Sequence, residues 1–272
     1  MALSTASATT PAATPTVTSA AVLQRRDWIA GLEKGLGMLE AFSDTHSRVT
    51  SAQMATIVGV TRTVARRHLL TLAHLGYVGT DGKLFWLTPR VLRMGQAFIE
   101  SSRLARVVQP YLQRVTAGTQ EMAYVSMMEG DDIVYVARNG PNRLMNTGFV
   151  LGARVPAHVT AAGMLLLATR NAPHYDDWLR HQTLRTFTQH TITDKAKLST
   201  ALAQVRQQDW AVSEQQLELH HRGIAVPLRD ARGQLAGALS VIMPMHNESQ
   251  NEALGRVLGV LRETAAAIRN LI

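Results

Sequence analysis

Cysteine is absent from this chain of 272 residues, and charged residues are scarce. Without cysteine the chain cannot form a disulfide, a thiolate nucleophile, a cysteine-held iron–sulfur cluster or a cysteine-ligated zinc site. Charged residues make up 18%, below the usual share of about 25%, whereas hydrophobic residues make up 46%. This balance excludes a wholly disordered chain, and the length suggests about two packed domains.

Long hydrophobic runs are missing as well. The longest, Ala161–Ala168, is far shorter than the ~20 residues that a membrane-spanning helix needs. Residues 1–24 carry no charge, and they lack both the basic start and the continuous apolar stretch of a secretory signal. We therefore expect a soluble, cytoplasmic protein with no membrane partner and with a disordered tail over residues 1–27.

Positive charge exceeds negative charge, and the excess is uneven along the chain. Lys and Arg number 28 against 20 Asp and Glu, which gives a formal net charge of +8. Residues 25–106 hold 12 of the basic and 6 of the acidic residues, and the remainder holds 16 and 14. A basic first third joined to a nearly neutral remainder indicates a nucleic-acid-binding domain followed by a second domain.

The basic region has the pattern of a helix–turn–helix. Apolar residues three or four apart predict a helix over about Ile29–Phe42. Either Thr50 or Ser51 can cap a short helix over Ala52–Val58, and a third helix runs over about Thr61–Leu75. A glycine follows each of the last two segments, as expected where a helix ends.

The third predicted helix has an apolar face and a basic face. The residues expected to face a core are Val64, Leu69, Leu72 and Leu75. Arg62 and Arg66 lie one turn apart on the other side, where arginine can either read guanine in the major groove or hold phosphate. A solvated charged face is the alternative. The predicted DNA-contact residues are Ser51, Thr61, Arg62, Thr63, Arg66, Arg67 and Lys83.

A hairpin and a further helix follow. Asp81-Gly82 is a tight-turn signal within residues 77–87 and predicts a β-hairpin, the wing of a winged helix–turn–helix domain over residues 28–88. Lys83 at its tip either contacts DNA or is a solvated turn residue. Thr88-Pro89 starts a helix with an apolar stripe, which we expect to act as a linker over residues 89–103 and as a dimer contact.

Residues 104–272 predict an α+β domain with an antiparallel sheet, because hairpins alternate with helices. The expected strands are Met122–Met127, Ile133–Ala137, Leu144–Leu151, Ile224–Arg229 and Leu235–Ile242. The expected helices are Leu104–Thr116, Ala161–Thr169, Tyr175–His181, Lys195–Gln208 and one around Leu254–Ile268. Pro110 predicts a kink or boundary, and Pro227 predicts a bulge or an edge position.

Several short stretches, taken in order, resemble a known family. They are Leu32-Glu33-Lys34-Gly35-Leu36, Val60-Thr61-Arg62-Thr63-Val64-Ala65-Arg66-Arg67, Leu75-Gly76-Tyr77-Val78, Leu87-Thr88-Pro89-Arg90-Val91-Leu92, Asp132-Ile133-Val134-Tyr135-Val136-Ala137-Arg138, Gly152-Ala153-Arg154-Val155-Pro156-Ala157-His158, Thr191-Ile192-Thr193-Asp194 and Ile224-Ala225-Val226-Pro227. Together they resemble the IclR family of bacterial transcriptional regulators over about residues 28–272. Residues 90–98, with Arg143-Leu144-Met145, resemble the branch that controls catabolism of aromatic acids such as protocatechuate or 4-hydroxybenzoate.

The resemblance implies a function and a set of partners. It implies a winged helix joined to a GAF-like effector-binding domain over residues 104–272, which responds to a small carboxylic acid. It also implies self-association as a dimer or tetramer on a pseudo-palindromic promoter site in double-stranded DNA. RNA polymerase is a further candidate partner. The alternative within this class is a regulator that responds to a non-aromatic, short-chain acid.

The effector site can be placed by chemistry and by resemblance. A helix capped by Thr160 offers free amides and a positive dipole end to a carboxylate. The residues that align with the family's pocket are Leu144, Thr147, Ala161, Ala162, Ser213, His221, Gly223, Ser240 and Ile242. The chain departs from the family at Gly163-Met164, usually Gly-Arg, at Gln215-Gln216, often with an acidic residue, and at His220-His221, more commonly Gly-Leu.

Plainer interpretations remain for these residues. Thr160 can be only a helix cap, His221 only a strand residue that is satisfied within the fold, and His158 belongs either to the core or to the pocket. Arg154 and Arg222 are expected in ion pairs rather than as ligand clamps.

Two other classes of protein compete with a regulator. The sequence has no G-x-S-x-G, Walker A, H-E-x-x-H or G-x-G-x-x-G motif, so we expect no catalytic residue, metal or cofactor. An enzyme acting on an aromatic acid in the C-terminal domain is thus the weaker alternative. A structural nucleoid protein would leave the large, nearly neutral second domain without a role.

Overall fold

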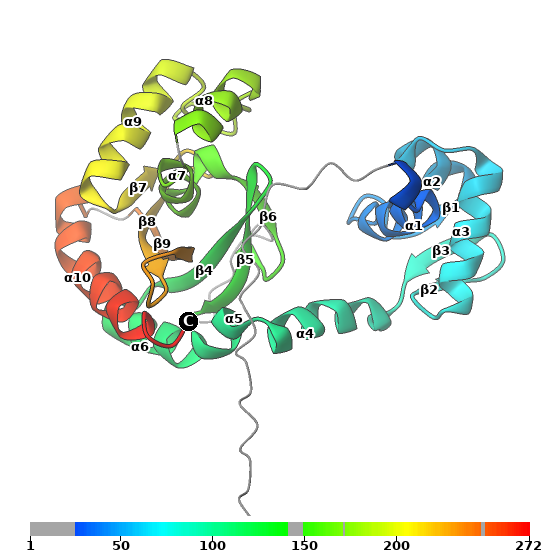
Figure 1. The fold of residues 1–272 in the computed structure, drawn as a ribbon, viewed down its shortest axis with the longest axis horizontal. Coiled ribbons are helices and arrows are strands. Elements are labelled where there is room, and N and C mark those ends of the chain that lie inside the picture. Colours follow the sequence, from blue (N-terminus) through cyan, green and yellow to red (C-terminus); the bar gives the residue numbers. More distant parts are fainter. Residues whose placement is uncertain (1–24, 141–148, 171, 246–247) are drawn as a thin grey trace, which may run out of the picture. The chain divides into compact units, whose positions relative to one another are not determined.

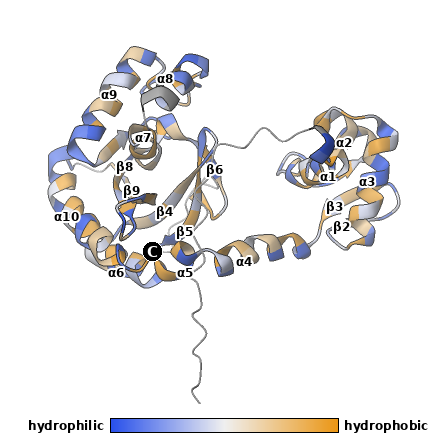
Figure 2. Cartoon of the chain, in the orientation of Figure 1, coloured by the Kyte–Doolittle hydropathy of each residue, from blue (hydrophilic) through white to orange (hydrophobic). Residues whose placement is uncertain are grey.

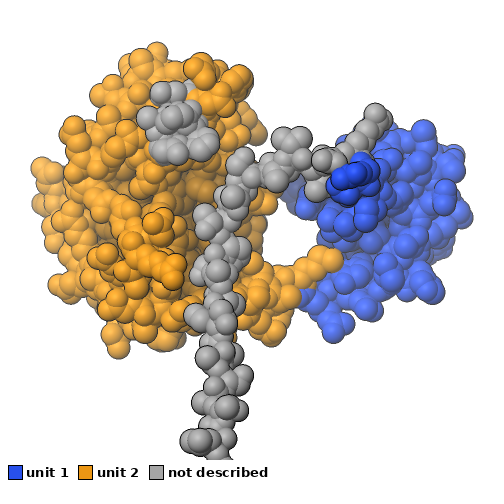
Figure 3. Space-filling view, in the orientation of Figure 1, with its two compact units in different colours: residues 1–93 blue, residues 94–272 orange. Residues whose placement is uncertain are grey.

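The computed structural model describes residues 25–140, 149–170, 172–245 and 248–272, without the side chains of residues 25, 172–174 and 176. The chain divides into two compact units, with the boundary between Arg93 and Met94 (Figure 1, Figure 3). That boundary falls inside helix α4, Leu92–Ser101. The limits predicted above for the individual domains and the linker stay a prediction.

The first unit combines three helices with a small antiparallel sheet, the winged helix–turn–helix expected from the sequence. The sheet has the strand order β1-β3-β2. Its elements are α1 (Ala30–Glu40), β1 (Val49–Thr50), α2 (Ser51–Val58), α3 (Arg62–His74), β2 (Val78–Thr80) and β3 (Leu84–Leu87), after a short 3-10 helix, Arg25–Asp27.

Side-chain caps fix where α2 and α3 begin. The Thr50 hydroxyl accepts a hydrogen bond from the Gln53 amide, and the Gln53 side chain accepts one from the Thr50 amide at 2.8 Å. This capping box settles the choice between Thr50 and Ser51 at the start of α2. Thr61 caps α3 as predicted, by accepting from the Val64 amide at 3.3 Å.

The core of the first unit confirms two of the four residues predicted for the apolar face of α3, and Val64 is only half-buried, outside this cluster. Leu69 and Leu72 are buried, together with residues of the other helices and strands. Leu75 was expected there and is instead 48% exposed. Leu75 follows the last residue of α3, where the chain turns at Gly76 with a φ of 80°, so the helical periodicity no longer holds at this position.

The second unit is built on a six-stranded antiparallel sheet with the order β6-β5-β4-β9-β8-β7. Its strands are β4 (Met122–Glu129), β5 (Asp132–Asn139), β6 (Arg154–Pro156), β7 (Ala211–Glu214), β8 (His221–Arg229) and β9 (Leu235–Pro244). Its helices are α5 (Arg103–Val107), α6 (Gln109–Thr119), α7 (Ala161–Ala168), α8 (Ala172–His181), α9 (Lys195–Gln208) and α10 (Gln250–Ile268), besides the rest of α4 and short 3-10 segments such as Ala157–Val159.

Helices cover both faces of this sheet. One buried cluster joins α7, α8 and α9 to one face, and a second joins α5, α6 and α10 to the other. Alternate residues of a strand serve opposite faces: Tyr124 belongs to the first cluster, whereas Ala123 and Val125 belong to the second. Figure 2 shows hydrophobic and hydrophilic residues interleaved on α9 and α10, as expected of helices with one buried side.

Some predicted elements need correction. In the strand expected over Leu144–Leu151, residues 144–148 lie outside the described residues, and Phe149–Leu151 is not a strand. The edge strand that pairs with β5 on the side away from β4 is β6. Pro110 lies in the first turn of α6, just after the break between α5 and α6 at Val108, so it marks a boundary rather than a kink. Pro227 lies in β8 beyond the residues that pair with β7, which is a local edge position.

Helix α7 is buried along its whole length, and its packing depends on a glycine. All eight of its residues are buried. A Cβ at Gly163 would overlap the backbone of Ala157, so only glycine allows α7 to lie this close to the preceding 3-10 segment. This contact holds the first turn of α7 against that segment.

Gly163→Ala should therefore lower the free energy of unfolding of the second unit by about 2–3 kcal/mol, because the Ala157 backbone must move. The matched control is Gly255→Ala in α10, where the added methyl group meets open space. That control should be neutral or stabilising by up to ~1 kcal/mol. Urea unfolding measures both, and equal stabilities of the two variants would contradict the close-packing account.

Candidate functional site

The first turns of α3 carry an exposed basic surface. Arg62, Arg66 and Arg67 are all exposed, and α3 has no acidic residue. Within the described part of the chain, none of the three guanidinium groups has an ion pair or a side-chain hydrogen bond. Three such cations on one helix can meet phosphates or guanine edges without first breaking a contact within the protein.

Of the other predicted DNA-contact residues, three are exposed and one is buried. Thr63 is exposed on α3, and Thr61 is exposed while it caps that helix. Lys83 is exposed in the turn between β2 and β3, where the Asp81 carboxylate accepts from the Lys83 and Leu84 amides at 2.9 and 2.7 Å. Ser51 is different, because only 8% of its surface is exposed. The structure therefore does not bring Ser51 to this surface.

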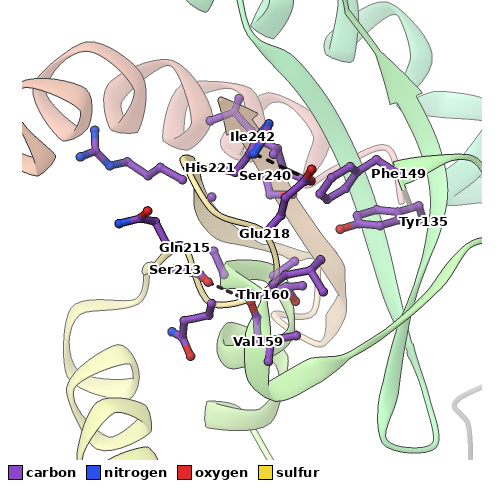
Figure 4. Close-up of a pocket in the computed structure, with 17 residues that line it drawn as sticks. Tyr135, Phe149, Val159, Thr160, Ser213, Gln215, Glu218, His221, Ser240 and Ile242 are labelled. Carbon is purple, nitrogen blue, oxygen red and sulfur yellow. Dashed lines mark hydrogen bonds and ion pairs between the residues drawn. The ribbon is translucent and has the colours of Figure 1, made fainter. Parts of the chain in front are cut away.

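The second unit contains a cavity between the sheet and the first turn of α7. It encloses about 410 Å³ of space, including its mouth. Eight of the predicted effector residues line it: Thr160, Ala161, Ala162, Ser213, His221, Gly223, Ser240 and Ile242 (Figure 4). Leu144 and Thr147 lie outside the described residues. Its lining combines apolar side chains with a few polar groups, which is the usual make-up of a small-molecule site.

One end of the cavity is the N-terminus of α7. The Thr160 hydroxyl accepts a hydrogen bond from the Gly163 amide at 3.0 Å, so Thr160 is both a helix cap and a lining residue. The Ala161 and Ala162 amides have no hydrogen-bond partner among the described residues. Two buried amides at the positive end of a helix can bind an anionic oxygen atom.

Neighbouring strands hold this end of the cavity together. The Ser213 hydroxyl, on β7, donates to the Val159 carbonyl at 2.9 Å, which ties the segment before α7 to the sheet. Gly223 lies opposite Ser213 on β8, and a Cβ there would come within 3.3 Å of the Ala161 Cβ. Ser213 thus has a partner within the protein, and Gly223 keeps α7 close to the sheet.

The other end of the cavity has an aromatic wall that the sequence analysis missed. The Tyr135 and Phe149 rings lie with their centroids 6.1 Å apart, and both line the cavity. The Tyr135 side chain is only 1% exposed, and its hydroxyl has no hydrogen-bond partner in the described part of the chain. The alternation of buried residues along β5, in which Ile133 and Tyr135 share a face, is the signal that could have identified Tyr135.

His221 and Glu218 continue this end. The Phe149 and His221 rings are 6.3 Å apart, and His221 Nδ1 lies 3.8 Å from a Glu218 carboxylate oxygen. The same nitrogen lies 3.0 Å from the Leu219 carbonyl. His221 therefore has contacts within the protein and also faces the cavity. Glu218, a carboxylate in the cavity wall, was not predicted.

The two arginines expected in ion pairs are found in ion pairs, and the histidine expected in the core or the pocket lies in the core. Arg222 is buried, and its Nε donates to the Glu214 carboxylate at 2.6 Å, whereas Arg154 pairs with Glu129 and Asp132. His158 does not line the cavity; it packs in the core with Nε2 3.2 Å from the Arg185 carbonyl. Burial lowers the pKa of His158, which favours its neutral form.

The described residues contain neither a metal-binding cluster nor a membrane-spanning helix. No group of three or more His, Asp or Glu among them could hold a metal ion. No helix among them is both long and apolar enough to cross a membrane.

Family models match both parts of the chain. The IclR helix-turn-helix domain matches residues 31–82, and the C-terminal domain of bacterial IclR transcriptional regulators matches residues 96–270. The chain is 36% identical to the p-hydroxybenzoate hydroxylase transcriptional activator of Acinetobacter baylyi, over 92% of this chain and 94% of that protein. It is 37% identical to the Pca regulon regulatory protein of Pseudomonas putida, over 90% and 84%.

A solved structure agrees with these matches. The inducer-binding domain of a double mutant of the PobR transcription factor from Acinetobacter, in complex with 3-hydroxybenzoic acid, is 32% identical to this chain. It aligns with a TM-score of 0.59 over 61% of this chain and 98% of that one. From both domain models and from relatives that align over most of its length, the chain belongs to the IclR family of bacterial transcriptional regulators.

Proposed function

We propose that the chain is a cytoplasmic regulator of a catabolic operon that binds promoter DNA and responds to an aromatic carboxylic acid of the hydroxybenzoate class. The observation that carries this proposal is the cavity, which combines an aromatic wall with two helix amides that have no partner among the described residues. The relatives named for p-hydroxybenzoate hydroxylase and for the Pca regulon support the aromatic class.

The two ends of the cavity suit the two ends of such a ligand. The Ala161 and Ala162 amides offer donors to the carboxylate, and the positive end of the α7 dipole favours its charge. The Tyr135 and Phe149 rings offer apolar area to an aromatic ring. A short-chain, non-aromatic acid is the second candidate, because the amides alone would suit any small carboxylate.

On the DNA side, we propose that Arg62, Thr63, Arg66 and Arg67 contact the major groove of a pseudo-palindromic site, and that Lys83 contacts the backbone or the minor groove. The free guanidinium groups of α3 and the helix–turn–helix geometry support this assignment. Thr61 is positioned to contact phosphate at the start of α3.

Self-association is the third part of the proposal. Helix α4 buries none of its residues, and Leu92, Met94 and Phe98 are 72%, 46% and 42% exposed. An exposed apolar stripe of this kind marks a protein–protein contact, and a pseudo-palindromic DNA site requires a two-fold pair of binding domains. We propose a dimer through α4, with a tetramer as a pair of dimers. A contact with RNA polymerase stays a prediction that the family resemblance implies.

The effector assignment predicts a selective thermal shift. At a concentration of 4-hydroxybenzoate near 100 times its dissociation constant, the second unit should gain about 2.7 kcal/mol of stability and melt roughly 5 °C or more higher. The control ligand is 4-hydroxybenzamide, which lacks the negative charge and should give a much smaller shift. A shift with pyruvate or glyoxylate and none with aromatic acids would favour the short-chain alternative.

The DNA assignment predicts that α3 controls specific binding. With a fragment that the wild-type protein selects from a random pool, Arg66→Ala/Arg67→Ala should weaken binding by at least 2 kcal/mol, roughly 30-fold, and should lower the salt dependence. Arg232→Ala, in the exposed turn between β8 and β9, removes a charge from the other unit and should leave binding near wild type. Fluorescence anisotropy measures both, and equal affinities would remove α3 from the interface.

The self-association assignment predicts that a charge on the α4 stripe separates the copies. Leu92→Glu/Phe98→Glu should raise the dissociation constant of the dimer at least ~tenfold, because two apolar side chains would no longer be buried. Gln96→Lys, at an exposed position on the same helix, is the control. Sedimentation velocity over a concentration series measures the change, and an unaltered dimer in the double variant would place the interface elsewhere.

A further inference from the structure

The Tyr135 hydroxyl is a buried polar group that the fold leaves without a partner. Tyr135 lies on β5 and is 1% exposed, and its hydroxyl has no hydrogen-bond partner among the described residues. Burying an unsatisfied hydroxyl costs about 1–3 kcal/mol, so such groups are rare unless something else binds them. Ser126, Tyr175 and Trp178 also have buried side-chain atoms without a partner, but they do not line the cavity, whereas Tyr135 does.

Figure 4 shows the Tyr135 hydroxyl pointing into the cavity, beside the Phe149 ring. The next tyrosine in the cluster, Tyr124 on β4, has its ring centroid 4.9 Å from that of Tyr135. The Tyr124 hydroxyl, in contrast, is hydrogen-bonded by the Arg138 side chain, and Tyr124 does not line the cavity. Of these two adjacent tyrosines, Tyr135 has a hydroxyl that is available to a ligand, whereas the Tyr124 hydroxyl is bound within the protein.

Charge determines which part of a ligand can meet Tyr135. A carboxylate is favoured at the α7 end, where the amides and the helix dipole lie. Glu218 lies at the Tyr135 end, and its carboxylate reaches toward Phe149 in Figure 4. A second carboxylate there would meet a like charge. The Tyr135 end therefore suits an uncharged polar group, and on an aromatic acid the simplest such group is a ring hydroxyl.

We propose that the Tyr135 hydroxyl hydrogen-bonds a ring hydroxyl of the effector and makes the cavity select hydroxylated aromatic acids over benzoate. This inference rests on the proposed function, since it assumes that the cavity binds an aromatic acid. Tyrosine can donate to the phenolic oxygen or accept its proton. A site built for a hydroxyl discriminates against the analogue without it, because the buried partner is then left unpaired.

The ionisation of Tyr135 is consistent with this role. Burial, reinforced by the neighbouring Tyr124, raises the pKa of Tyr135 well above its ordinary value. The side chain therefore keeps its proton at physiological pH and presents a neutral donor to an anionic ligand.

The test compares benzoate with 3- and 4-hydroxybenzoate on the full-length protein by isothermal titration calorimetry. The wild type should bind one of the hydroxybenzoates at least ~tenfold more tightly than benzoate. Tyr135→Phe removes only the hydroxyl and should reduce that preference to about threefold or less, with the affinity for benzoate nearly unchanged. The control, Tyr124→Phe, makes the same change on β4 and should keep the preference.

Thermal unfolding without ligand separates this role from a structural one. Tyr135→Phe should melt at the same temperature as the wild type or higher, because no hydrogen bond is lost. Tyr124→Phe should melt lower, since it loses the bond to Arg138. A clear loss of stability in Tyr135→Phe would mean that the hydroxyl has a partner in the protein, and would overturn the inference.

The remaining outcomes are also decisive. If Tyr135→Phe weakens benzoate and the hydroxybenzoates equally, Tyr135 contacts the carboxylate or the ring, and the hydroxyl assignment is wrong. If its preference equals that of the wild type, the assignment is wrong while the proposed effector class stands. If the wild type binds none of the three acids, the proposed function fails first, and the inference fails with it.

Discussion

A helix that is buried along its whole length must still satisfy the amides of its first turn, and α7 does so only in part. Thr160 accepts from the Gly163 amide, whereas the Ala161 and Ala162 amides face a cavity without a partner among the described residues. Gly163 lets this turn lie against the Ala157 backbone, and Gly223 on β8 keeps it close to the sheet. The buried position of α7 therefore creates the unsatisfied donors that a carboxylate would complete.

The sheet positions several of the residues that surround the first turn of α7. Because alternate strand residues face opposite layers, one face carries the core with α5, α6 and α10, and the other carries both the α7 core and the cavity wall. Tyr135 on β5, Gly223 on β8 and Ser240 on β9 reach the cavity from strands far apart in sequence. The first unit has a separate core, so its exposed arginines depend on local helix packing alone.

Local signals predicted most of the fold. Cap residues such as Thr61, Thr160 and the turn at Asp81-Gly82 identified helix starts and the wing, because they act through neighbouring backbone amides. Short strands such as β6 and β7 were missed, since they are held by pairing with distant strands rather than by local pattern. The described residues that align with the family's pocket line one cavity, but Tyr135 on β5 and Glu218 between β7 and β8 were missed, because which residues border an empty space depends on the packed structure.

The central claim is that the first turn of α7 binds the carboxylate of an aromatic acid. A crystal structure of the full-length protein grown with 4-hydroxybenzoate tests it most directly. The account predicts a carboxylate oxygen within about 2.7–3.2 Å of the Ala161 or Ala162 amide nitrogen, with the ring against Tyr135 and Phe149. A ligand bound outside this cavity, or one with its carboxylate turned toward Glu218 and away from α7, would contradict the account.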